Sequence, residues 1–226
     1  MLNYEVSQDE ANGCLIVRGE ILLGSKPVEI PINNAKQENL KKQFISFFLH
    51  KKDVEIGINY LDCISLNNHP RANEGLFVGA LSVYFKCFQN CDARIAINED
   101  AFKRNFPQVA DHFDRFKQWR NKHYLHDENG MTQTCAFLLI APGDNPEKFG
   151  GPPYVVWNSV GVDYINEGHC LRSVMQATLN FIVGRIDSVG NEIEKEVENL
   201  TKSELLALKE AHIELATTNS PEQKRG

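Results

Sequence analysis

One short segment of the chain, FDRFKQWRNKHYLHDENG, gathers most of the side chains that could do chemistry. Within thirteen residues it holds Arg115, Lys117, Arg120, Lys122, His123, His126 and Asp127. Histidine, with a reference pKa near ~6.5, can accept or deliver a proton at neutral pH, and arginine can hold two phosphate oxygens through a transition state. Breaking a phosphodiester without a metal needs both functions, because the attacking hydroxyl requires a base and the developing phosphorane charge requires a cation. The composition of the segment therefore indicates a site that transfers protons during a reaction at a phosphate group.

The surroundings of this segment are basic, whereas the chain as a whole is acidic. The net charge of -6 argues against a protein that coats nucleic acid along its whole surface. Between residues 101 and 126, however, six basic residues stand against two acidic ones, a local balance of about +4. We expect Lys117, Lys122 and His123 to supply contacts to an anionic substrate in this region.

Arg120 occupies an unusual position in the helical pattern. At ~100° per residue, Val109, Phe113, Phe116 and Arg120 fall within roughly 60° of one another, so Arg120 continues an apolar face. A guanidinium cannot be deprotonated and is costly to bury without a partner. Three outcomes stay open: a structural pair with a carboxylate, a place in a cleft at the end of a bundle, or a site for an anionic ligand.

The spacing Arg120-Asn121-x4-His126 resembles the RX4-6H motif of the HEPN superfamily. The resemblance covers the motif and the flanking order of helices, roughly residues 72–200. It implies a helical bundle that is often a metal-independent endoribonuclease of toxin, antiphage-defence or RNA-processing type, with its cleft between two protomers. On this resemblance Arg120, Asn121 and His126 are catalytic, single-stranded RNA is the substrate, no cofactor is needed, and the protein is a homodimer.

Two alternatives to this assignment stay open. Six residues of continuous helix rise ~9 Å and turn His126 about 120° away from Arg120, so either the helix ends or distorts near Leu125 or the two residues meet across a symmetric interface. His123, one turn from Arg120, is the competing histidine. The alternative function is a non-catalytic module of the same fold that binds RNA, a nucleotide or a protein partner, with the N-terminal region as its recognition element.

The elements that must position these residues are mostly helical. Apolar residues at helical spacing predict a buried helix from residue 72 to 88, and Asn98 is a good N-cap for a short helix over 99–104. Pro107 begins a further helix that runs to about Leu125. Strand-like runs at 134–140 and 154–157 predict a hairpin, and a long helix follows over 168–200. Thr201 and Glu204 have capping-box spacing for a last helix.

The first part of the chain instead favours strands. Four runs, at 14–17, 20–23, 28–32 and 54–60, have strand composition, with one helix between the third and fourth. The expected fold class is therefore α+β and predominantly helical. A small β-rich region with one helix (1–68) precedes a HEPN-like helical domain (69–200) that carries a hairpin insertion near 132–158. A C-terminal helix and a disordered tail (201–226) complete the chain.

Composition limits the classes of protein to which the chain can belong. Hydrophobic residues at 42% and charged residues at 24% are globular proportions, and the longest apolar stretches reach about ten residues against the ~18 to 20 of a membrane span. No signal-peptide pattern opens the sequence, so we expect a cytoplasmic protein without a membrane segment. The six cysteines form no CxxC pair, and we expect no metal site.

Overall fold

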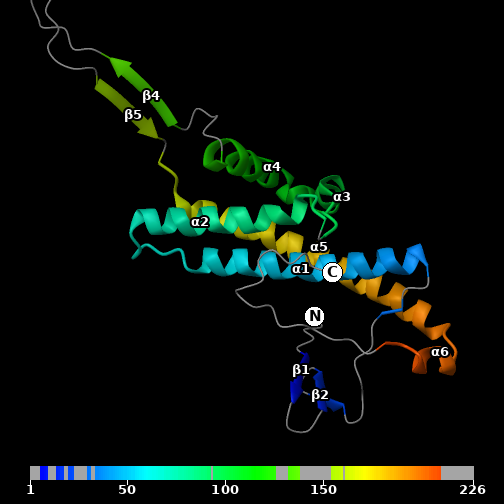
Figure 1. Ribbon diagram of the computed structural model, residues 1–226. Coiled ribbons are helices and arrows are strands. Elements are labelled where there is room, and N and C mark those ends of the chain that lie inside the picture. The colour runs from blue at the N-terminus through cyan, green and yellow to red at the C-terminus, as the bar shows by residue number, and fades with distance from the viewer. Residues whose placement is uncertain are drawn as a thin grey trace, which may run out of the picture. The chain divides into compact units, whose positions relative to one another are not determined.

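The computed structural model describes residues 6–9, 14–17, 20–22, 30–31, 34–92, 94–125, 132–137, 154–159 and 161–209. Six α-helices lie within these residues (Figure 1): α1 (Ala35–Asp62), α2 (Pro70–Phe85), α3 (Glu99–Asn105), α4 (Ala110–Gln118), α5 (Tyr164–Glu198) and α6 (Lys202–Leu206). Short 3-10 turns occupy Lys86–Phe88 and Pro107–Val109, and a π-helical segment occupies Trp119–Leu125. The fold of the described residues is thus predominantly helical, as expected.

In the described part of the chain, five short strands pair in two antiparallel sets. The first set follows the order β1 (Val6–Asp9), β2 (Cys14–Val17) and β3 (Glu20–Leu22). The second set pairs β4 (Thr132–Phe137) with β5 (Tyr154–Ser159), in a register that runs from Thr132 opposite Ser159 to Phe137 opposite Tyr154. The second set lies where the hairpin insertion was expected.

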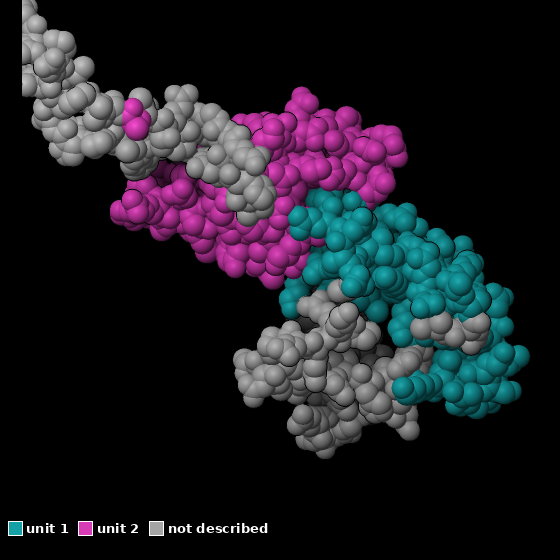
Figure 2. Space-filling model, turned by 45° about the horizontal axis from the view of Figure 1, so that its top comes forward, with its two compact units in different colours: residues 1–52, 88–97, 179–226 teal, residues 53–87, 98–178 magenta. Residues whose placement is uncertain are grey.

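The chain divides into two compact units (Figure 2). Unit 1 comprises residues 1–52, 88–97 and 179–226, and unit 2 comprises residues 53–87 and 98–178. Helices α1 and α5 each contribute residues to both units. The segment with the candidate catalytic residues belongs to unit 2.

The core of unit 2 is built largely from aromatic rings. Fully buried side chains come from α2 (Phe77, Leu81, Tyr84), α3 (Phe102), α4 (Phe113, Phe116) and α5 (Leu171, Val174, Met175). Phe113 packs on Phe85 and on Phe102, each with ring centroids 5.4 Å apart. The buried Tyr84 hydroxyl hydrogen-bonds the Thr178 hydroxyl at 2.8 Å, which spares a polar group the cost of burial without a partner.

Glycine allows helix α1 to approach its neighbours closely in unit 2. A Cβ on Gly57 would lie 2.9 Å from the terminal methyl carbon of Met175 and 3.5 Å from the carbonyl oxygen of Ala80. Helix α2 runs back along the second half of α1, and a Cβ on Gly79 would lie 3.3 Å from the Tyr60 ring (Figure 1). A side chain at Gly57 would therefore force the Met175 side chain to move.

Unit 1 is held by apolar burial and by polar contacts from α1. Leu40 and Phe47 of α1 and Ile182 and Val189 of α5 are buried. The Ser46 hydroxyl accepts a hydrogen bond from the Ile95 backbone N–H at 3.0 Å.

One expected strand is wrong. Residues 54–60 were expected to form a strand, but they lie within the 28-residue helix α1. Val54, Ile58 and Leu61 are buried at a spacing of three to four residues, which is the helical period. The run VEIGINY alternates apolar and polar residues as well, so the strand pattern masked the helical one. The β-rich region expected over 1–68 is therefore helical from Ala35 to Asp62.

Candidate functional site

The candidate catalytic segment begins on a π-helical turn. The helix expected from Pro107 to about Leu125 is present, but it changes type twice, from a 3-10 turn to α4 and then to the π-helical segment Trp119–Leu125. Such π-helical turns are rare and are frequent at functional sites. The helix is therefore distorted before Leu125, which is one of the two arrangements that could bring Arg120 and His126 together.

Arg120 and Asn121 are adjacent, partly buried and in contact. The Arg120 Nη1 atom donates a hydrogen bond to the Asn121 Oδ1 atom at 2.9 Å. The amide oxygen of Asn121 accepts this bond, and its amide nitrogen is the atom that could donate to a phosphate oxygen. The contact thus holds the Arg120 guanidinium against the Asn121 side chain.

An aromatic cluster supports the π-helical segment. The ring of the fully buried Phe77 lies with its centroid 6.0 Å from Phe116, 6.2 Å from Trp119, 6.4 Å from Tyr124 and 5.5 Å from Tyr164. Trp119 and Tyr124 belong to the π-helical segment, so this segment is packed against α2 on either side of Arg120. Trp119 accordingly packs on Phe77 and on Phe116.

Both tyrosines of the cluster are neutral at physiological pH. Burial raises the pKa of Tyr124 well above its usual value, and the neighbouring Tyr164 and the carboxylates of Glu74 and Glu167 act in the same direction. Burial is also the main cause that raises the pKa of Tyr164. The surroundings of Arg120 therefore carry no phenolate charge near pH 7.

Arg115 connects α4 to the start of α5 through an ion pair. Its Nη1 and Nη2 atoms donate to the two carboxylate oxygens of Glu167 at 3.0 and 2.6 Å. The guanidinium carbon also lies 4.9 Å from the ring centroid of Phe116 and 5.2 Å from that of Trp119, within the range of cation–π attraction. Sequence reasoning missed Glu167, because nothing in its neighbourhood indicated a partner 52 residues away.

Other basic residues of the region are paired with carboxylates too. Lys117, which was expected to contact substrate, donates to both carboxylate oxygens of Glu99 at 2.6 and 2.7 Å. Lys103 donates to Asp114 at 2.8 Å, a contact that raises the pKa of Lys103. Counting Glu99 and Glu167 lowers the local balance from about +4 to about +2. The positive potential here is weaker than the sequence count suggested.

The remaining site residues are described only in part. Asn121 is followed by Lys122, whose side chain is exposed. The backbone of His123 belongs to the π-helical segment, and its side chain lies outside the described residues. His126 lies outside the described residues altogether, so the choice between the two histidines stays a prediction.

The described residues hold neither a metal-binding cluster nor a membrane-spanning helix. Among the residues that the structure describes, no group of three or more His, Cys, Asp or Glu side chains is placed to hold a metal ion. No helix in the described part of the chain combines the length and apolar character that a membrane crossing requires. Cys63 and Cys91 are exposed free thiols, and Cys87 is a buried one.

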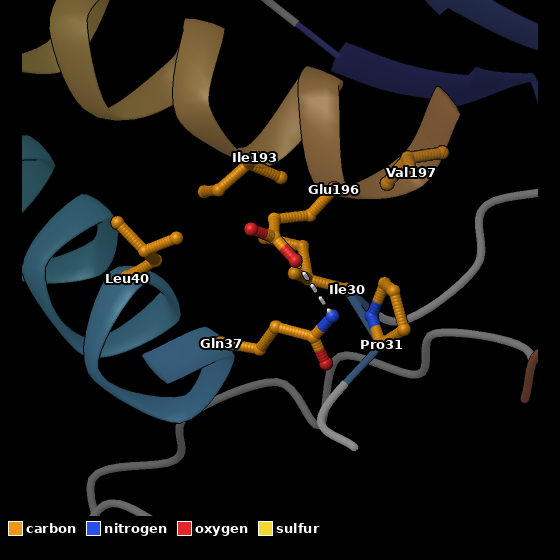
Figure 3. A pocket seen from close by; sticks show the side chains of 7 residues that line it. All are labelled: Ile30, Pro31, Gln37, Leu40, Ile193, Glu196 and Val197. Atoms are coloured by element: carbon orange, nitrogen blue, oxygen red, sulfur yellow. Dashed lines mark hydrogen bonds between the residues drawn. The ribbon is translucent and has the colours of Figure 1, made fainter. Parts of the chain in front are cut away.

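A small pocket in unit 1 is part of the packing and not a binding site. Figure 3 shows that it is lined by Ile30, Pro31, Gln37, Leu40, Ile193, Glu196 and Val197. Its volume of about 10 Å³ admits one water molecule at most. Across it Gln37 donates a hydrogen bond to Glu196 at 3.3 Å, and Lys36 forms an ion pair with the same carboxylate. These contacts join the start of α1 to the end of α5.

Comparisons with known proteins return no relative. No protein-family model, no curated protein and no solved structure matches the chain.

Proposed function

We propose that this protein is a metal-independent endoribonuclease of HEPN type that cleaves single-stranded RNA. The observation that carries the proposal is the contact between Arg120 Nη1 and Asn121 Oδ1, made on a π-helical turn at the end of α4. The rare π-helical turn lies at the motif arginine, and such turns are frequent at functional sites. This supports a site in which the Arg120 guanidinium is held in a defined orientation.

In the proposed reaction His126 accepts the proton of a 2′-hydroxyl. The freed oxygen attacks the adjacent phosphorus, the bond from phosphorus to the 5′-oxygen breaks, and the leaving 5′-oxygen takes up a proton. Arg120 stabilises the charge that develops on the phosphorane oxygens, while Asn121 keeps its guanidinium in place. The products are an RNA with a 2′,3′-cyclic phosphate end and an RNA with a 5′-hydroxyl end.

The proposed enzyme is a homodimer, and its context is that of a toxin or an antiphage-defence protein. A second copy would bring His126 of one protomer to Arg120 of the other, which removes the need for both to lie on one face of a helix. Exposed Lys122, together with His123, would contact the RNA backbone, because Lys117 and Arg115 already bind carboxylates.

The proposal is tested by incubating the purified chain with labelled single-stranded RNA in EDTA and identifying the product ends. Cleavage should persist, since the mechanism uses no metal, and the 3′ ends should be cyclic phosphates. Activity that disappears in EDTA and returns with a divalent cation would contradict the mechanism. RNA that binds without being cut, and binds more weakly to Arg120→Ala, would instead support the non-catalytic module.

A further inference from the structure

A second and larger pocket lies in unit 2, and none of its lining residues belongs to the π-helical segment. It has a volume of about 150 Å³ and is formed where the end of α1, the turn after it and the start of α5 meet. Its lining is half apolar and half polar: Leu61, Asp62, Ile64, Ile165, Gly168, His169 and Arg172. None of these residues is among the proposed catalytic residues.

The size of the pocket suits one ring. An engineered protein cavity of about 150 Å³ holds a benzene molecule. Gly168 contributes to this space, because a Cβ built on it would lie 3.5 Å from Ile64 Cδ1 and 4.0 Å from Leu61 Cδ2. These are ordinary contact distances, so an alanine would fit here and would occupy part of the pocket.

The polar side of the pocket offers more donors than acceptors. Arg172 forms an ion pair with Asp62 through its Nη1 atom, which offsets the carboxylate charge. A guanidinium carries five N–H donors in a planar fork, so its remaining donors are available to a second acceptor. His169 lies one turn before Arg172 on the same helix and lines the same pocket. Arg172 and Asp62 are each nearly half exposed, so a ligand can reach them from solvent.

We propose that this pocket binds a small carboxylate with an apolar body about the size of a benzene ring. The ligand's carboxylate accepts hydrogen bonds from Arg172 and His169, and its ring packs against Leu61, Ile64 and Ile165. A charged acceptor facing a guanidinium makes the stronger class of hydrogen bond, while the apolar body displaces water from the aliphatic side.

Three ligands of one shape test the polarity of the site. The full chain is titrated at pH 7 with benzoate, benzamide and benzylamine, which carry negative, zero and positive charge, and binding is followed by calorimetry and by NMR shifts of the pocket residues. Benzoate should bind about tenfold more tightly than benzamide, and benzylamine should bind weakest. Inorganic phosphate, an anion without an apolar body, should bind more weakly than benzoate. Equal binding of phosphate, or preference for benzylamine, would overturn the assignment.

Variants of the ion pair separate a binding role from a structural one. Arg172→Gln should weaken benzoate binding about tenfold, whereas Asp62→Asn should strengthen it, because the guanidinium is then no longer shared. An ion pair that only braced α1 against α5 would make both variants fail in the same direction. Arg185→Gln, on the same helix but in unit 1, is the matched control and should bind benzoate as the wild type does.

Gly168→Ala tests the space itself. The variant should bind benzoate several-fold more weakly, because the added methyl group enters the pocket. It should also unfold at a higher temperature, because alanine favours a helix more than glycine does. Loss of binding with gain of stability excludes a folding defect, and unchanged benzoate binding would refute the location. RNA cleavage is not a readout, so this test stands or fails separately from the proposed reaction.

Discussion

At the scale of single residues, the site depends on an arginine held by its neighbour. Asn121 accepts from Arg120 at 2.9 Å, and both side chains are only partly exposed. A guanidinium oriented before substrate binds loses little side-chain entropy when it meets a phosphate. Because Arg120 and Asn121 are neighbours in the chain, their contact requires only that the π-helical turn be formed.

Substitution of the motif residues gives the most direct prediction. Arg120→Ala and His126→Ala should each abolish cleavage of single-stranded RNA, because acid–base catalysis and charge stabilisation each contribute about 10² to 10⁴-fold. His123→Ala should retain most activity. Cleavage rates are measured beside melting temperatures, with Arg104→Ala, an exposed basic residue of α3, as the control. A dead His123 variant beside a fully active His126 variant would show that the motif was assigned to the wrong histidine.

Glu167 predicts a residue-level effect that only the structure reveals. Glu167→Gln should lower the free energy of unfolding by about 1 kcal/mol, because Arg115 keeps its place on Phe116 and Trp119 but loses its charged partner. Urea unfolding measures this, and Glu198→Gln at the exposed end of α5 should change stability by less than about 0.5 kcal/mol. Equal stability of the two variants would mean that the Arg115–Glu167 pair contributes nothing measurable to the free energy of unfolding.

At the scale of elements, the sequence predicts helices well where caps and periodicity agree. The helix expected over 99–104 is α3, and Asn98 caps it by accepting from the Ala101 N–H at 2.8 Å. The capping box of Thr201 and Glu204 is likewise confirmed at α6. Residues 54–60 were misread, because a short apolar run satisfies the strand period and the helical period together, and only packing decides between them.

The local geometry of the candidate site could not be predicted from the sequence. The motif names Arg120 and Asn121, whose catalytic role stays a prediction, and no pattern indicated the change from α-helix to π-helix at Trp119. That change coincides with contacts from Phe77 of α2, far away in the sequence, to Trp119 and Tyr124. Pairing of Lys117 with Glu99 escaped prediction for a similar reason, since local charge counts ignore a carboxylate that another helix supplies.

The buried tyrosines give a prediction of pH dependence for the aromatic core. Burial raises the pKa of Tyr84, Tyr124 and Tyr164, whereas an unfolded tyrosine titrates near ~10. Below about pH 10 the phenols are neutral in both states, so their contribution to stability is complete. Above it the unfolded chain loses protons that the folded chain retains, and the free energy of unfolding should fall.

Urea unfolding at about pH 8 and about pH 11 measures this decline. Tyr124→Phe should make the decline shallower, because the phenylalanine has no proton to lose in the unfolded state. Tyr60→Phe is the control, since Tyr60 is among the exposed large side chains and should leave the slope as it is in the wild type. A decline of equal steepness in both variants would show that Tyr124 does not take part.

At the scale of the whole molecule, the proposed reaction depends on assembly. His126 follows Arg120 by six residues, so in a regular α-helix of one chain it would lie about 120° away from Arg120. A two-fold dimer places Arg120 of each protomer opposite His126 of the other and so creates two equivalent composite sites. Light scattering at micromolar concentration should report a dimer, and a monomer would contradict this arrangement.

Mixing two inactive variants tests whether the sites are shared. Arg120→Ala and His126→Ala homodimers should each be inactive, because every site lacks one partner. After mild unfolding and refolding together, about half of the dimers are mixed, and each mixed dimer has one site with both an intact arginine and an intact histidine. Cleavage should therefore return to about a quarter of the wild-type rate. If the mixture stays inactive although mixed dimers are present, Arg120 and His126 act within one chain, and the π-helical turn alone must bring them together.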